Sequence, residues 1–162
     1  MTEPERTWRK RAPVPLDEDF VVSTWLMSYS RSREGYHAGA MPKSQARTAF
    51  WDAHRPVVEL LARSADVEVI CDDEDPNVVY AWACTSGDVV HGCIVKREYE
   101  RADPEGAREM VRELLGERLD RACPYTYFPY DLQLLKLLPR DWYPAAAWLA
   151  QNYGDKLARK AA

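Results

Sequence analysis

The chain has 162 residues, of which 46% are hydrophobic and 30% are charged, and its formal net charge is −4 at pH 7. This length is enough for one domain with a substantial core and too short for two comfortable ones. The composition is that of a globular domain, and the net negative charge excludes a general electrostatic attraction to nucleic acid or to a membrane surface. We therefore expect a single domain over residues 1–162, with residues 1–6 disordered.

Hydrophobic periodicity divides the chain into strands and helices. Alternating segments predict strands, apolar residues three or four apart predict helices, and stretches rich in Gly or Pro without a period predict loops. In chain order we expect a strand at residues 7–14, a helix at 17–30, a loop at 31–43, a helix at 44–64, strands at 67–71, 78–85 and 89–95, a helix at 104–121, a strand at 125–130, and helices at 132–138 and 144–160.

The three strands between residues 67 and 95 are separated by an acidic turn at 72–77 and a tight turn at Gly87, which predicts a three-stranded antiparallel meander. The acidic turn lacks the oxygen spacing and central Gly of a calcium loop, so we interpret it as a solvated hairpin loop and expect no metal site. The predicted fold class is α/β of the α+β kind, with a central, mostly antiparallel sheet flanked by helices.

Cysteine usage and hydropathy bear on location. The four cysteines form no C-x-x-C motif, and two of them lie in apolar runs, which is typical of core residues in a reducing compartment. No apolar run approaches the roughly 20 residues of a membrane span, and we recognise no signal peptide. We expect a cytoplasmic protein without a membrane partner.

The strand at 89–95 leads through a charged turn into a helix that begins near Pro104. A strand that runs into a helix N-terminus is a ready phosphate site, because the first turn leaves backbone N–H groups unpaired and carries the positive end of the helix dipole. The alternative is an ordinary strand-turn-helix corner, since Pro104 and Glu105 also make a good generic helix start.

This stretch resembles the GCN5-related N-acetyltransferases, the GNAT family. Ile94-Val95-Lys96-Arg97-Glu98-Tyr99 is similar to the end of the family's central strand, and the following turn is similar to its Arg-x-x-Gly-x-Gly/Ala loop. The order of the predicted elements is also close to that of the family. The resemblance implies acetyl-CoA as co-substrate, no metal, and these cofactor-binding residues: Cys93, Ile94, Val95, Arg101, Gly106 and Ala107.

The sequence departs from the GNAT pattern at two places. Glu100 stands where the family usually has an Arg, and Asp103 and Glu105 place negative charge where the pyrophosphate should bind. Residues 142–160 look helical, so we expect the closing C-terminal hairpin of the family to be replaced by a helix.

Three segments narrow the resemblance to small bacteriophage GNAT-like proteins: residues 20–29, 50–54 and 91–96. Such proteins include the DNA-modification protein Mom and acetyltransferases of thymidine hypermodification, and the similarity covers about residues 12–145. It implies acetyl-CoA and an amine acceptor on modified DNA as partners, and the host cytoplasm as location. The basic segment at residues 6–11 can lie along a phosphate backbone, although a solvated terminal strand is the alternative.

Acetyl transfer to an amine needs a neutral amine, a donor for the developing oxyanion and an acid for the leaving thiolate. The resemblance implies a backbone N–H near Ile94 or Val95 as the oxyanion donor and a tyrosine late in the chain as the acid. A histidine at the start of the central strand can act as base, and each candidate has the alternative of a packed aromatic with a solvated polar tip. The candidates are the catalytic residues Tyr143, His91 and Tyr127 and the substrate-binding residues Tyr29 and His37.

Two functions from different classes follow. The first is an enzyme, a GNAT-fold N-acyltransferase that moves an acetyl group from acetyl-CoA to an amine. The second is a non-catalytic or donor-switched GNAT-fold protein that acts as a binding module for protein or nucleic acid, because fold alone does not determine function.

Overall fold

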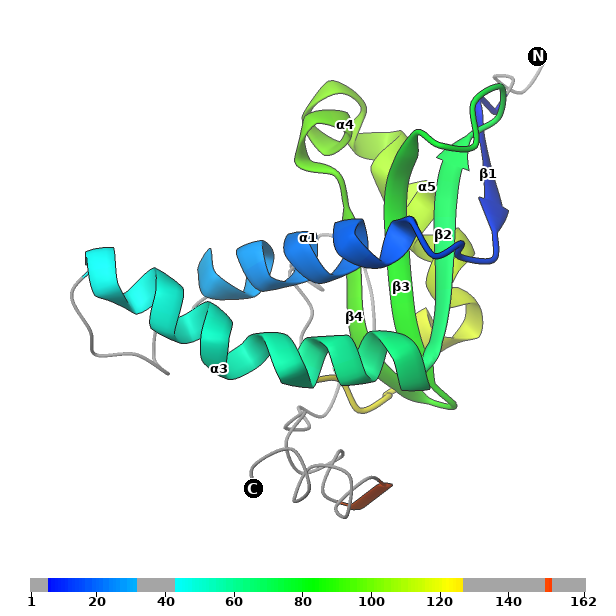
Figure 1. Ribbon diagram of the computed structural model, residues 1–162. Helices are drawn as coiled ribbons and strands as arrows, with labels where there is room; N and C mark the ends of the chain where they lie inside the picture. The colour runs from blue at the N-terminus through cyan, green and yellow to red at the C-terminus, as the bar shows by residue number, and fades with distance from the viewer. Residues whose placement is uncertain (1–5, 32–42, 127–150, 153–162) are drawn as a thin grey trace.

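The computed structural model describes residues 6–31, 43–126 and 151–152, and its centre is a four-stranded antiparallel sheet (Figure 1). The strands lie side by side in chain order as β1 (Trp8–Arg11), β2 (Asp66–Asp72), β3 (Val79–Ser86) and β4 (Val89–Val95). The helices are α1 (Asp17–Arg31) and α3 (Lys43–Ser64) on one face of the sheet and α5 (Pro104–Leu115) on the other. The predicted α+β class, an antiparallel sheet flanked by helices, is confirmed.

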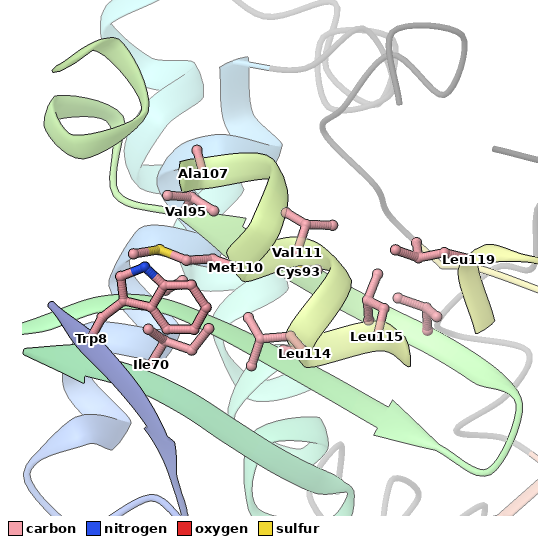
Figure 2. Close-up of a cluster of buried hydrophobic side chains, with 13 residues drawn as sticks. Trp8, Ile70, Cys93, Val95, Ala107, Met110, Val111, Leu114, Leu115 and Leu119 are labelled. Atoms are coloured by element: carbon pink, nitrogen blue, oxygen red, sulfur yellow. The ribbon is translucent and has the colours of Figure 1, made fainter. Parts of the chain in front are cut away.

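The core under α5 follows directly from the helical period of the sequence. The apolar residues that recur every three or four positions along the helix are buried, and these side chains pack on apolar residues from all four strands (Figure 2). Burial of one such leucine stabilises the fold by about 1.5–3 kcal/mol. The packed helix residues are Ala107, Met110, Val111, Leu114 and Leu115, with Leu119 just beyond them.

Two tryptophans pack on the opposite face of the sheet, which α1 and α3 cover. The rings of Trp25 from α1 and Trp82 from β3 have centroids 5.1 Å apart, and the Trp82 indole N–H donates to the Thr24 hydroxyl at 2.8 Å. A Cβ at Gly92 of β4 would lie 3.0 Å from the Trp82 ring and 3.2 Å from the Trp25 ring. The glycine therefore lets β4 pass directly beneath the two indoles.

Two element predictions were wrong. Residues 97–102, expected in a charged turn, form the short helix α4 (Arg97–Ala102). The neighbouring Arg, Glu and Ala favour a helix, and Tyr99 packs against the hydrophobic core between the sheet and α5, which we call the α5-face core. The helix expected over 104–121 ends at Leu115 and continues as a 3-10 turn, η1 (Gly116–Leu119). Gly116 has φ +52°, a left-handed conformation that ends the α-helix.

The predicted helices at 132–138 and 144–160 lie outside the described residues, except for residues 151 and 152, which are helical. The same is true of residues 1–5 and of most of the predicted loop at 31–43 and strand at 125–130. In the part of the chain that is described, no helix is both long and apolar enough to cross a membrane.

Candidate functional site

β4 has a different kind of neighbour on each of its two edges. Beyond α5 the chain returns to the outer edge of β4, where Val90 forms a parallel bridge with Tyr125. The Val90 N–H donates to the Pro124 carbonyl at 3.0 Å, and the Thr126 N–H donates to the Val90 carbonyl at 2.9 Å. β4 therefore has an antiparallel strand on one edge and a parallel segment on the other. This pairing lies at the amino end of β4, at Val90, whereas the predicted oxyanion donors Ile94 and Val95 lie at the carboxyl end of the same strand.

The register of β4 decides which of its backbone groups face the outer edge. The Lys96 N–H donates to the Tyr80 carbonyl of β3 at 2.6 Å, and Ile94 lies opposite Trp82. Because hydrogen-bonding direction alternates along an antiparallel strand, the Ile94 N–H also points toward β3, whereas the N–H groups of Cys93 and Val95 point toward the outer edge. Of the two amides singled out as oxyanion donors, Val95 is the one on the side of the Tyr125 segment.

His91 is the extra residue of a β-bulge. Cys84 lies opposite Gly92 and Thr85 lies opposite Val90, so no β3 residue faces His91. The imidazole is fully buried, and burial lowers the pKa of His91 to about 4. It is therefore neutral at pH 7.

The histidine is fixed by two hydroxyl groups. Its Nε2 lies 2.9 Å from the Ser86 hydroxyl oxygen, and its carbonyl accepts a hydrogen bond from the Thr126 hydroxyl at 2.6 Å. A neutral imidazole can accept a proton, which suits a base. The ring has no exposed surface, whereas the Ser86 hydroxyl that it contacts is half-buried. Sequence reasoning missed Ser86, although a serine across a tight turn from a strand histidine is a readable signal.

The turn expected to bind phosphate is closed by its own side chain. The Asp103 carboxylate accepts a hydrogen bond from the Gly106 N–H at 3.0 Å, and the Asp103 carbonyl accepts one from the Ala107 N–H at 3.0 Å. Gly106 and Ala107 are buried, while Arg101 is exposed on α4. The N–H groups of Gly106 and Ala107 therefore already have acceptors, and one of these acceptors carries a negative charge. These residues do not fit the pyrophosphate of acetyl-CoA.

Two tyrosines lie beside this turn. The Tyr80 hydroxyl donates to Asp72 at 2.7 Å, which raises the pKa of Tyr80 to about 12. The Tyr99 ring has its centroid 4.8 Å from that of Tyr80, and burial raises the pKa of Tyr99. Both side chains therefore remain protonated hydrogen-bond donors at neutral pH. Sequence reasoning did not select them, because their proximity depends on the fold of α4.

The other candidate residues divide into three groups. Cys93 and Val95 pack in the α5-face core together with Ala107, and Ile94 packs on the opposite face. Tyr29 belongs to α1, but its side chain is outside what the structure describes, as are His37, Tyr127 and Tyr143 entirely. In residues 6–31 and 43–126, no three His, Cys, Asp or Glu side chains gather closely enough to hold a metal ion.

The basic N-terminal segment is charge-balanced. Each of its four cations lies within 4.0 Å of a carboxylate from another part of the chain. The pairs are Arg6 with Glu113, Arg9 with Asp73, Lys10 with Glu68, and Arg11 with Asp17. The segment therefore offers less positive charge to a nucleic acid than its sequence implied.

Comparison with known proteins gives only faint similarity. No family model and no curated protein sequence matches the chain. The solution structure of apo-form YjaB from Escherichia coli is 13% identical with a TM-score of 0.45, and the match covers 67% of this chain and 64% of YjaB, less than two thirds of its length. A crystal structure of a GCN5-related N-acetyltransferase from Rhodopseudomonas palustris is 13% identical with a TM-score of 0.43, covering 73% of this chain and 71% of that one.

Proposed function

We propose that the chain is a GNAT-like N-acyltransferase that moves an acyl group from a thioester to an amine, with acetyl-CoA as the reference donor. The observation that carries this proposal is the outer edge of β4, which pairs in parallel with Tyr125 at the amino end of the strand and toward which the Val95 N–H points at the carboxyl end. The succession of elements, a strand, helices, three antiparallel strands and a helix leading to a parallel segment, also supports it.

β4 carries two groups with chemistry that acyl transfer needs: the Val95 N–H near its carboxyl end and His91 near its amino end. A backbone N–H aimed at a carbonyl oxygen stabilises the negative charge that develops there. The neutral His91 imidazole, linked to the Ser86 hydroxyl, can take up the proton that an attacking amine releases. We propose Tyr127 and Tyr143 as acids for the leaving group, and Tyr29 and His37 as contacts to the acceptor.

Replacing Val95 by proline tests the amide directly. Proline removes the N–H on the outer edge and leaves the hydrogen bonds toward β3 in place. Loss of one oxyanion donor lowers kcat by about 10²–10³. Val95→Ala is the matched control, because it keeps the N–H and removes buried side-chain atoms. Acetyl transfer is measured by mass spectrometry on folded variants. An equal loss in both variants would remove the amide from the mechanism.

For the acceptor we propose an amine on a modified DNA base, on the strength of the resemblance to bacteriophage proteins. The protein is incubated with acetyl-CoA and DNA that carries aminomethyl or aminoethyl uracil, the DNA is digested to nucleosides, and the acetyl mass increment is sought. A free amine serves as the parallel substrate. Turnover of the free amine with no increment on the DNA would discard this acceptor and leave the acyltransferase proposal intact.

The salt dependence of activity on DNA tests whether the basic residues of β1 bind the DNA backbone. If the basic residues of β1 leave their carboxylates and follow the DNA backbone, activity on DNA falls by on the order of tenfold or more between low and moderate salt. If the observed ion pairs persist, activity on DNA changes little with salt.

The second function, a non-catalytic or donor-switched binding module, is favoured by the Asp103 carboxylate on the Gly106 N–H. A protein of this kind gives no acetyl transfer to any amine. Turnover that depends on the Val95 amide would exclude it.

A further inference from the structure

The N-terminus of an α-helix is normally an anion site, because its first N–H groups lack partners inside the helix. The first long helix after β4 is α5, which follows the short helix α4. In α5, which has 12 residues, the site is already filled by Asp103. We infer that Asp103 is a built-in anion at the phosphate position, and that the chain recognises its donor by the pantetheine thioester arm without a pyrophosphate at this turn. The statement about the donor rests on the proposed function, whereas the statement about Asp103 does not.

The space over the helix start supports this inference. A Cβ placed on Gly106 would lie 2.3 Å from one Asp103 carboxylate oxygen, 2.9 Å from the carboxylate carbon and 3.2 Å from the Tyr99 hydroxyl oxygen. The absence of a side chain at Gly106, which elsewhere lets a phosphate approach the backbone, here lets the protein's own carboxylate approach it. The Asp103 carboxylate therefore blocks a phosphate from the start of α5 both by the space that it occupies and by its charge.

The charge at this turn has no internal counterion. No ion pair to Asp103 occurs within the described part of the chain, and the adjacent Glu105 is paired with Arg108 at 2.9 Å. A second anion at the start of α5 would therefore meet the full repulsion of the Asp103 carboxylate. Removing that carboxylate should turn the same helix start into an ordinary anion site.

The test compares the wild type with Asp103→Gly and Asp103→Asn. Glycine vacates the position and is tolerated at a helix N-cap, while asparagine keeps a capping oxygen and removes the charge. Thermal unfolding first establishes that both variants are folded. Titration calorimetry is then carried out with inorganic pyrophosphate, CoA and pantetheine.

We expect no pyrophosphate binding to the wild type and CoA and pantetheine affinities within about threefold of each other. Asp103→Gly should gain about fivefold or more for pyrophosphate and CoA, with pantetheine unchanged, because an anion at a helix N-terminus gains that order of stabilisation. Asp103→Asn should gain less, because its side chain still occupies the amide.

Wild-type CoA binding ten or more times tighter than pantetheine binding would overturn the inference, as would an unchanged pyrophosphate affinity in Asp103→Gly. If neither CoA nor pantetheine binds the wild type and Asp103→Gly gains pyrophosphate, the proposed function fails and the role of Asp103 stands.

Discussion

Aspartates begin the helices on opposite faces of the sheet, and only one of them, Asp17, has an ion-pair partner among the described residues. Asp17, the first residue of α1, is 5% exposed and receives hydrogen bonds from the Arg11 guanidinium at 2.6 and 3.1 Å and from the Val14 N–H at 2.8 Å. Asp103, the N-cap of α5, is exposed and accepts from the Gly106 N–H. The same residue type serves the fold in one place and faces incoming ligands in the other.

The difference lies in what each carboxylate connects. Arg11 joins Asp17 and also donates to the Pro76 carbonyl at 2.7 Å, so the pair ties β1, α1 and the turn between β2 and β3 together. Among residues 6–31 and 43–126, Asp103 bonds within its own turn and with Tyr99 on α4. A carboxylate with a long-range cation is thus part of the scaffold, and one without it keeps its charge available.

The largest expected effect is that of Asp17→Ala. The substitution leaves the Arg11 side chain, 18% exposed, without its partner, and breaking such a pair lowers the free energy of unfolding by about 3 kcal/mol. Urea unfolding monitored by circular dichroism measures the loss. The double variant Arg11→Met with Asp17→Leu should recover much of it. A loss of less than about 1 kcal/mol would mean that Asp17 is no more structural than Asp103.

Acid should destabilise the protein in two windows. Burial raises the pKa of Asp17, but the hydrogen bonds from Arg11 and Val14 outweigh it, so the pKa lies below its usual value of 3.8. Its stabilisation is present above pH 4 and is lost as pH falls through the lowered pKa. His91 acts earlier, because the unfolded state takes up a proton as pH falls from 6.5 toward 4 while the buried ring resists it, which removes about 2–3 kcal/mol.

Unfolding measured from pH 7 to pH 2 separates the two groups. Asp17→Asn should flatten the decline below pH 4 and leave the His91 decline unchanged. A decline below pH 4 that is as steep in Asp17→Asn as in the wild type would show that Asp17 does not cause it.

A smaller effect is expected for Asp103→Ala. Loss of an N-cap acceptor lowers stability by about 1 kcal/mol, whereas Asp103→Asn keeps the acceptor and should stay within a few tenths of wild type. Thermal unfolding of both variants measures the difference. A loss as large as that of Asp17→Ala would show that Asp103 supports more than its own helix end.

The smallest effect is expected for Arg6→Gln. Arg6 pairs with Glu113 at 3.5 Å, and its side chain is 60% exposed, so the ion pair contributes about 0–0.5 kcal/mol. Arg11→Gln, on the same short segment, is the matched comparison and should cost several times more. Equal losses would indicate that burial of the pair does not decide its contribution.

The sequence was sufficient for features set by local period. The inward residues of α5, such as Met110 and Leu114, could be identified because a helix repeats its inner face every three or four residues. The negative charge of Asp103 at the phosphate turn was also visible in the sequence. Its contact with the Gly106 N–H was not, because that requires the backbone angles of the turn.

Long-range geometry accounts for the rest. The approach of Arg11 to Pro76 spans 65 positions of the chain, and the bulge that aims His91 toward Ser86 depends on the register between β3 and β4. Neither is fixed by periodicity. The short helix α4 was missed because its six residues are too few for a period, and burial of Tyr99 decides its conformation.

Because the four cysteines are buried, their reactivity with an added reagent reports where the folded structure opens. Cys71, Cys84 and Cys93 lie on three consecutive strands, Cys123 lies after η1, and each is at most 1% exposed. Burial also raises the pKa of Cys84, which keeps this thiol protonated at neutral pH in the folded state. An alkylating reagent can modify these sites only when the surrounding structure opens. Mass spectrometry gives the order in which the four cysteines are alkylated. This order is therefore the order in which the structure around each cysteine opens.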